Sequence, residues 1–244
     1  MKDNFSKRAN LYSRFRPGYP QQLYDFLIEL VADKKTAWDC GTGNGQVAEK
    51  LSNYFEKVYA TDISASQLAN AVSKKNIFYS IENAEKTSFA DNQFDLITVA
   101  QALHWFDFEK FYAQARRTLK QESLIVVFGY NLMRINNEIN VITDHFYKNI
   151  IGPYWDAERK YVDENYKTIP FPFKEIKTPA FTNDYEWNIE QVIGYISTWS
   201  AVQHFITKNN RDPIAEIREP LKKAWGNDQK RKVSFPIFMR AGKK

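Results

Sequence analysis

Apolar and polar residues follow two alternating patterns through the first 130 residues. Apolar residues spaced three and four apart predict amphipathic helices, most clearly from Leu23 to Val31 after Pro20 and from Phe108 to Leu119. Short, nearly continuous apolar runs predict buried strands at 36–40, 57–61, 76–81, 94–100 and 123–128. Strands that alternate with helices in this way predict an α/β fold with a parallel, doubly wound sheet and helices on both faces.

The pattern changes after Tyr130. Residues 131–172 are rich in Tyr, Asn and Asp, and prolines interrupt them, so we expect an inserted helical or irregular segment over about 131–180 that covers one edge of the sheet. The remaining elements that we predict are a strand at 173–182, helices at 189–206 and 211–225, and a last strand at 232–240. Because no linker divides the chain, we expect one domain over 1–244, preceded by an aromatic, arginine-rich arm at 1–20.

Composition narrows the functional classes. The single cysteine excludes an intrachain disulfide, and the first residues lack the apolar core of a signal peptide. No apolar run has the length that spans a bilayer, so we expect a cytoplasmic protein with no membrane partner. The net charge of +5 is spread along the chain, which favours a small anionic partner over nucleic acid. Oligomeric state is left open.

One stretch combines a strand, a glycine turn and the start of a helix. Residues 37–46 read AWDCGTGNGQ, with glycines at 41, 43 and 45. Glycines let the backbone turn sharply and let a ligand lie directly against it, as in nucleotide-binding α/β domains. The alternative is that the glycines serve only to turn the chain and that no ligand binds there.

Polar residues follow four of the predicted strands. Asp39 precedes the glycines, Asp62 ends the second strand, Asn83 follows the third, and Gln101 and His104 follow the fourth. Ligands of doubly wound sheets bind at these carboxyl ends. A carboxylate there accepts hydrogen bonds from ribose hydroxyls, an amide reads an adenine edge, and a second carboxylate faces an ammonium group. Adenosine joined to an amino acid meets these demands, although a helix cap at Asp62 and a turn at Asn83 remain alternatives.

These segments resemble a known family. DCGTGNGQ, Asp62, NAE at 83–85 and AQALHWF at 100–106 resemble the class I S-adenosylmethionine-dependent methyltransferases, most closely the trans-aconitate methyltransferase group. YSRFRPGYP at 12–20, TWSAV at 198–202 and the closing RKVSFPIFMRAGKK extend the resemblance, whereas 131–180 matches nothing in it. The resemblance implies a Rossmann-like sheet of seven strands in the order 3-2-1-4-5-7-6, with 232–240 antiparallel. It also implies S-adenosyl-L-methionine as cofactor.

The resemblance assigns a role to each matching residue. The methionine part of the cofactor falls to Asp39, Gly41, Gly43 and Gly45. The ribose falls to Asp62, and the adenine to Ile63, Asn83 and Ala84. The arm residues Tyr12 and Arg16 close over the cofactor. Gln101 lies under the sulfonium end, and His104 and Trp105 border the acceptor, which makes these three the candidates for the catalytic step.

The resemblance implies that the methyl acceptor is a small molecule, and we expect the group that is methylated to be a carboxylate. Methyl transfer to a carboxylate needs no base and no metal, because the cofactor is already activated and the acid is ionised. It needs cations, and the guanidinium fork suits a carboxylate best. Arg14, Arg134 and Arg159 are the candidates. His104 is either a general base or an orienting group, and our hypothesis is orientation.

Other functions stay open. A phenol or an amine as acceptor would use His104 as a base. A nicotinamide dehydrogenase would place its third glycine one position after Gly45, and an adenine methyltransferase acting on nucleic acid would carry Pro-Pro where residues 100–105 read AQALHW. A module that binds the cofactor without catalysis is the remaining alternative.

Overall fold

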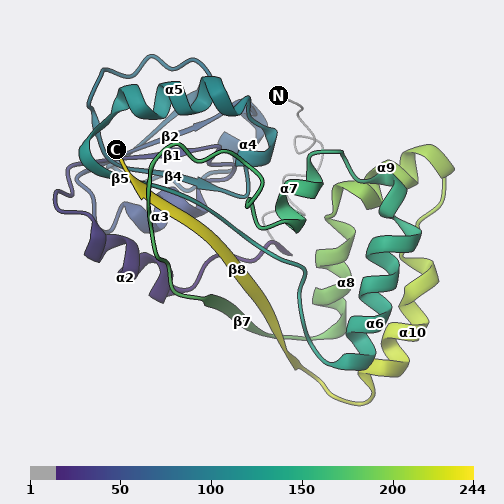
Figure 1. Ribbon diagram of the computed structural model, residues 1–244. Coiled ribbons are helices and arrows are strands. Elements are labelled where there is room, and N and C mark those ends of the chain that lie inside the picture. Colours follow the sequence, from purple (N-terminus) through teal and green to yellow (C-terminus); the bar gives the residue numbers. More distant parts are fainter. Residues whose placement is uncertain (1–14) are drawn as a thin grey trace.

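One mixed β-sheet forms the centre of the protein, as a computed structural model that describes residues 15–244 shows (Figure 1). The strand order is β3-β2-β1-β4-β5-β8-β6, and β7 also pairs with β8. The strands are β1 (Thr36–Cys40), β2 (Lys57–Asp62), β3 (Ile77–Ile81), β4 (Phe94–Ala100), β5 (Leu119–Tyr130), β6 (Lys174–Ile176), β7 (Phe181–Trp187) and β8 (Arg231–Lys243).

Strands β1 to β5 are parallel, as the alternating pattern predicts. Their registers bring the carboxyl ends to one edge: Cys40 lies opposite Thr61 and Asp62 opposite Ile81. The polar residues that follow these strands are therefore gathered at a single edge of the sheet.

Helices cover both faces of the parallel part, because alternate strand residues point to opposite sides. Ala37 and Leu96 pack with α2 (Gln21–Leu30) and α3 (Gln46–Leu51). Their neighbours Trp38 and Ile97 pack with α5 (Phe108–Thr118) on the other face. This confirms the predicted Rossmann-like arrangement of helices, sheet and helices (Figure 1).

The prediction of seven strands was wrong, because the structure has eight among its described residues. The segment expected as one strand at 173–182 contributes to two, β6 and β7, which pair antiparallel with opposite ends of the 13-residue β8. Pro179 lies between them, and a proline has no backbone N–H to donate to a neighbouring strand. The order of the sheet is otherwise the predicted one, with β8 as the antiparallel member beside β5.

Four helices form a separate layer beyond the end of the sheet (Figure 1). They are α6 (Asn137–His145), α8 (Ile189–Ser197), α9 (Ser200–Asn209) and α10 (Ala215–Trp225), and their buried residues share one core. The single helix predicted at 189–206 was wrong: Trp199 takes an extended conformation and separates α8 from α9.

The remaining helices are short. They are α4 (Ala65–Leu68), α7 (Arg159–Asp163), the 3₁₀ turns η2 (Leu103–Trp105) and η4 (Gly152–Tyr154), and the π-helical turn η3 (Phe146–Ile150). The chain between β5 and β6 is thus helical in large part, while its description as an insertion stays a prediction. No helix among residues 15–244 combines the length and apolar character that crossing a bilayer requires.

Candidate active site

The loop after β1 depends on its three glycines. Gly41, Gly43 and Gly45 have φ of +69°, +56° and +81°, a region that favours glycine. A Cβ on Gly41 would lie 2.6 Å from the Ala102 Cβ, and one on Gly45 would lie 2.4 Å from the Tyr79 hydroxyl. A Cβ on Gly43 would meet no atom within 4 Å. Gly41 and Gly45 therefore permit close packing, whereas Gly43 borders open space.

Asp39 holds this loop in place through hydrogen bonds. Its side chain is buried and accepts hydrogen bonds from Thr42 Oγ1 at 2.5 Å, Thr98 Oγ1 at 2.8 Å and the Ala48 backbone N at 3.2 Å. Burial raises the pKa of this carboxyl to about 6, although the three hydrogen bonds oppose the shift. The carboxylate thus fixes the start of the loop and of α3.

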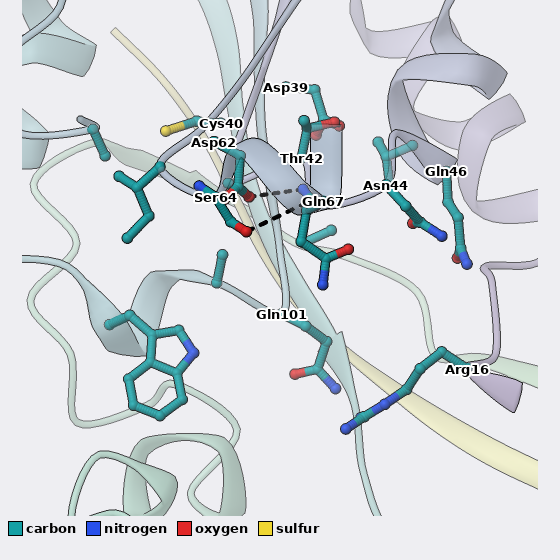
Figure 2. Close-up of a pocket in the computed structure, with 18 of the residues that line it drawn as sticks. Arg16, Asp39, Cys40, Thr42, Asn44, Gln46, Asp62, Ser64, Gln67 and Gln101 are labelled. Atoms are coloured by element: carbon teal, nitrogen blue, oxygen red, sulfur yellow. Dashed lines mark hydrogen bonds between the residues drawn. The ribbon is translucent and has the colours of Figure 1, made fainter. Parts of the chain in front are cut away.

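Asp62 joins the end of β2 to the same loop. Its Oδ2 accepts a hydrogen bond from the Gly43 backbone N at 2.8 Å, and its Oδ1 accepts one from the Ser64 backbone N at 2.9 Å (Figure 2). The cap of α4 is supplied by Ser64, which accepts from the Gln67 backbone N. Asp62 therefore joins β2 to the glycine loop and does not cap α4.

A cavity of about 1020 Å³ opens above the glycine loop, and we call it the loop cavity. It lies between the loop, the ends of β2 and β4, and the arm (Figure 2). The predicted residues that line it are Arg16, Asp39, Gly41, Gly43, Asp62, Ile63, Ala84, Gln101 and Trp105. The structure thus brings together residues from five separate segments of the chain.

Some predicted residues lie outside the loop cavity. Gly45 packs under Tyr79, and Asn83 accepts a hydrogen bond from the Glu85 backbone N within its own turn. Glu82 and Ala84 border the cavity in place of Asn83. Sequence reasoning missed Glu82, Ser64 and Gln67, although Glu82 directly follows the strand predicted at 76–81 and the other two lie shortly after the strand predicted at 57–61. Tyr12 and Arg14 lie outside the described residues.

Gln101 occupies the end of β4 in a conformation that L-residues rarely adopt. Its φ is +52°, its backbone N donates to the Phe128 carbonyl, and its side-chain Nε2 donates to the Tyr130 carbonyl at 2.9 Å. A Cβ on Gly129 would lie 2.7 Å from Gln101 Oε1, so that glycine makes room for the amide. Backbone strain held by neighbouring contacts is characteristic of functional sites.

Arg16 connects the arm with the helical layer. Its Nη1 donates to the Tyr130 hydroxyl at 3.1 Å, its Nη2 donates to the Thr198 carbonyl at 3.3 Å, and its guanidinium lies 5.7 Å from the centre of the Tyr195 ring. The residue lines the loop cavity and also a second cavity. Arg16 thus borders the cavity above the glycine loop, while its role of closing over the cofactor stays a prediction.

The second cavity has a volume of about 510 Å³, and we call it the histidine cavity. Its lining residues are Arg16, Gln101, His104, Trp105, Trp155, Asp156, Arg159, Trp199 and Ser200. Arg16, Gln101 and Trp105 belong to both cavities. The two cavities therefore adjoin each other at these three side chains.

His104 is buried at the base of the histidine cavity. Its Nδ1 lies 2.8 Å from the Tyr166 hydroxyl, and its ring centre lies 4.7 Å from that of Trp105. Burial, and secondarily the charge of Arg159, lowers the pKa of the imidazole to about 3. The imidazole is neutral at physiological pH, and it is a weak base.

Arg159 is the predicted arginine that reaches this cavity. Its Nε donates to the Tyr147 hydroxyl at 2.7 Å and pairs with Asp163 at 3.2 Å, and its guanidinium lies 4.8 Å from the centre of the Trp155 ring. Arg134, by contrast, forms an ion pair with Asp144 at 2.7 Å and lines neither cavity. The structure therefore does not support Arg134 as an acceptor ligand.

Together the cavities suit two ligands. The loop cavity offers a glycine backbone with open space at Gly43, and two carboxylates at neighbouring strand ends. These groups fit an adenosine that carries a charged amino acid, because carboxylates hold hydroxyl and ammonium groups. The histidine cavity offers two guanidinium groups, a carboxylate, indole rings and a neutral imidazole, a set of polar and aromatic groups that suits a small polar molecule.

Comparisons with known proteins agree with this geometry. Residues 38–127 match the family model described as "Methyltransferase domain". The chain is 36% identical to a protein of Dictyostelium discoideum named as a methyltransferase, over 99% of this chain and 95% of that one. It is 24% identical to an S-adenosylmethionine-dependent methyltransferase, by name, of Saccharomyces cerevisiae, over 75% of this chain and 65% of that protein.

A solved structure named as a type II methyltransferase of Anaeromyxobacter dehalogenans superposes with a TM-score of 0.87 at 35% sequence identity, over 94% of this chain and 98% of that chain. The fold and the site thus define a Rossmann-like methyltransferase, and the chain belongs to the methyltransferase family. It is an enzyme, and its cofactor is S-adenosylmethionine. The names of these three relatives specify no acceptor, so the likeness to the trans-aconitate group remains part of the proposal below.

Proposed function

We propose that the enzyme methylates a carboxylate oxygen of a small acid, of the kind that trans-aconitate represents. The observation that carries this proposal is the position of Arg159. Its guanidinium lines the histidine cavity, which shares Gln101 and Trp105 with the loop cavity. A cation therefore lies where a methyl acceptor would meet the cofactor.

The loop cavity holds the cofactor in this proposal. Asp39, Gly41 and Gly43 surround its methionine part, Asp62 accepts from the ribose, and Ile63 and Ala84 contact the adenine. When bound, S-adenosylmethionine supplies a methyl group on a positively charged sulfur, which an acceptor oxygen takes in one displacement. The protein residues bind, orient and exclude water, which is what a reaction between two preactivated partners requires.

Arg159 is built to receive a carboxylate. Tyr147, Asp163 and Trp155 hold it by its Nε and by its face. Neither Nη atom makes a hydrogen bond to any residue within 15–244. Two parallel N–H donors on a fixed plane match the two oxygens of a carboxylate. The rigid support also means that little side-chain freedom is lost on binding.

His104 fits an acceptor that is already ionised. An imidazole with a pKa of about 3 is too weak a base to remove a proton from a phenol or an ammonium group at neutral pH. A carboxylate has no proton to lose. The neutral imidazole therefore orients the acceptor, as the sequence hypothesis states.

Methylation of an amine is a second candidate, and Asp156 favours it. This carboxylate lines the histidine cavity with 12% of its side chain exposed. It would attract a cationic amine, although Arg16 and Arg159 in the same cavity would repel one.

An acceptor panel tests the proposal. The full chain is incubated with S-adenosylmethionine labelled in its methyl group and with small acids, phenols or amines. We expect product from acids alone, and we expect base to release the label, because esters hydrolyse. Arg159→Gln should raise the KM for the acid about 10- to 100-fold, since a charge-assisted hydrogen bond contributes about 1.5–3 kcal/mol.

Arg134→Gln is the matched control, because Arg134 lies in a surface ion pair outside both cavities. It should leave KM within about twofold of the wild type. Product from amines or phenols alone, or equal effects of the two arginine variants, would contradict the proposal.

A further inference from the structure

A second residue, Tyr166, lies directly beneath His104 and takes no part in the proposed function above. It is fully buried, and both it and Asn165 have φ near +58°. Arg240 of β8 donates hydrogen bonds to the Tyr166 and Ile169 carbonyls at 2.9 and 2.6 Å. The strained turn is thereby fastened to the sheet, and its tyrosine has a fixed position.

The hydrogen bond between Tyr166 and His104 has one direction. The phenol oxygen lies 2.8 Å from His104 Nδ1 and makes no other hydrogen bond to a residue within 15–244. Burial raises the pKa of Tyr166, so the phenol keeps its proton. A phenol has a single O–H, and because a buried O–H needs an acceptor, that hydrogen goes to Nδ1.

The other ring nitrogen then carries the imidazole proton. A neutral imidazole has one N–H, and if Nδ1 accepts, Nε2 is the donor. Nε2 makes no hydrogen bond to any residue within 15–244. It is also not one of the fully buried polar atoms without a partner in that range, so it retains some exposure. Because His104 lines the histidine cavity, its Nε2–H is open to that cavity.

We propose that Tyr166 is a positioning residue that fixes the Nε2–H tautomer of His104, so that the imidazole donates a hydrogen bond to an oxygen of the methyl acceptor. The inference rests on the proposed function in that the acceptor occupies the histidine cavity. The inference also says which methyl acceptors the site favours. A donor at this point stabilises an acceptor that presents a lone pair, and it cannot take up a proton from a phenol or an ammonium group.

The charged and titratable groups around His104 support a tautomer that is stable to pH. Arg159, Arg16 and Asp156 line the same cavity, and Tyr112 of α5 and Arg159 influence Tyr166 through their charges. The two arginines disfavour an imidazolium, whereas Asp156 favours one. Burial, which is the largest influence on His104, also disfavours the charged form.

Nuclear magnetic resonance reads the tautomer without any acceptor. The chain has three histidines, and a His104→Gln sample identifies the signals of His104 in the full chain labelled with ¹⁵N-histidine. We expect the Nε2–H pattern, unchanged between pH 6 and 8. In Tyr166→Phe the signals should move towards a mixture of the two tautomers. A wild-type spectrum with the proton on Nδ1 overturns the inference, and this result needs no folded variant.

Kinetics with two amide variants supply the second readout. The side-chain N–H of glutamine reaches the position of Nε2, whereas that of asparagine lies nearer Nδ1. We expect His104→Gln to keep kcat within about tenfold and His104→Asn to lose at least tenfold more. Equal losses, or the reverse order, overturn the inference. If the panel yields no product from acids while the Nε2–H spectrum is observed, the proposed acceptor is wrong and the tautomer assignment stands.

Discussion

Thr42 Oγ1 donates a hydrogen bond of 2.5 Å to Asp39 Oδ2, which ties the glycine loop to the end of β1. Asp39 also accepts from Thr98 of β4 and from the first helical turn of α3. One buried carboxylate therefore sets the relative positions of two strands, a loop and a helix. Its ionisation costs free energy, because burial raises its pKa to about 6.

This carboxylate predicts a specific dependence of stability on pH. Its folded pKa of about 6 exceeds the ordinary value of 3.8, so its stabilising contribution is complete below pH 3.8 and is lost as the pH rises through about 6. Asp39→Asn cannot ionise and lacks this dependence. Between pH 4 and 7 the free energy of unfolding of the wild type should fall, relative to the variant, by up to about 3 kcal/mol. Denaturant titration of both proteins without cofactor measures the difference, and a constant or rising difference would contradict the assignment.

Two glycine variants separate ligand binding from folding. Gly43→Ala places a methyl group into open space beside the loop cavity, so its cost to folding is the left-handed conformation alone, about 1–2 kcal/mol. It should weaken S-adenosylhomocysteine at least tenfold in calorimetry, because the backbone must contact the ligand there. Gly45→Ala would instead collide with Tyr79 and should lower the melting temperature more than Gly43→Ala does. Equal affinities of Gly43→Ala and the wild type would exclude Gly43 from the donor site.

Much of the loop cavity was predictable because strand ends are local signals. Asp39 and Asp62 each follow an apolar run, and parallel strands bring such ends to one edge whatever the intervening sequence. The hydrogen bond between Asp62 and Gly43 then joins residues that are 19 positions apart. The two predicted carboxylates and the glycine loop therefore appear as neighbours in the structure.

The histidine cavity was less predictable, because it depends on contacts between distant and irregular segments. Tyr166 and His104 are in contact although they are 62 positions apart in the sequence. Neither the turn that contains Tyr166 nor its hydrogen bond to Arg240 of β8 produces a periodic sequence pattern. Arg134 and Arg159 look alike in the sequence, and only their partners, a surface aspartate and a buried tyrosine, distinguish them. Pro179 separates β6 from β7 within the segment predicted as one strand. This separation reflects how the two strands pair with β8, which the sequence pattern does not reveal.

Asp95 provides a test of stability at the opposite edge of the sheet. Its side chain is 2% exposed, accepts from the Thr36 backbone N at 2.8 Å and pairs with Lys120 at 2.5 Å. Asp95→Ala leaves a buried backbone donor and a lysine without this partner and should cost about 3–5 kcal/mol of unfolding free energy. Asp91→Ala removes an ion pair whose carboxylate is 70% exposed and should cost under about 1 kcal/mol. Both variants should bind S-adenosylhomocysteine normally while folded, and similar losses of stability would show that burial does not set the strength of these pairs.

Phe15, in the part of the arm that the structure describes, packs against a glycine of the helical layer, which allows the contribution of this contact to cofactor binding to be measured. A Cβ on Gly194 of α8 would lie 2.7 Å from the Phe15 ring, and the next residue, Arg16, lines both cavities. Gly194→Ala should displace Phe15 and weaken the hydrogen bonds of Arg16 to Tyr130 and Thr198. We expect the dissociation constant of S-adenosylhomocysteine to rise about 5- to 30-fold, because each of these two hydrogen bonds contributes about 1 kcal/mol.

Gly194→Ala should not lower the stability of the fold, so a loss of affinity would reflect the displaced Phe15 and not a general loss of structure. Alanine is favoured over glycine by about 1 kcal/mol within a helix, so α8 itself becomes more stable. Gly152→Ala is the control, because its Cβ would make an ordinary contact of 3.6 Å with the Tyr147 carbonyl. Adding Phe15→Leu to Gly194→Ala should recover part of the affinity by removing the collision. A Gly194→Ala enzyme with normal affinity, or a loss that the second substitution leaves unchanged, would show that the seat of Phe15 on α8 does not control the cofactor site.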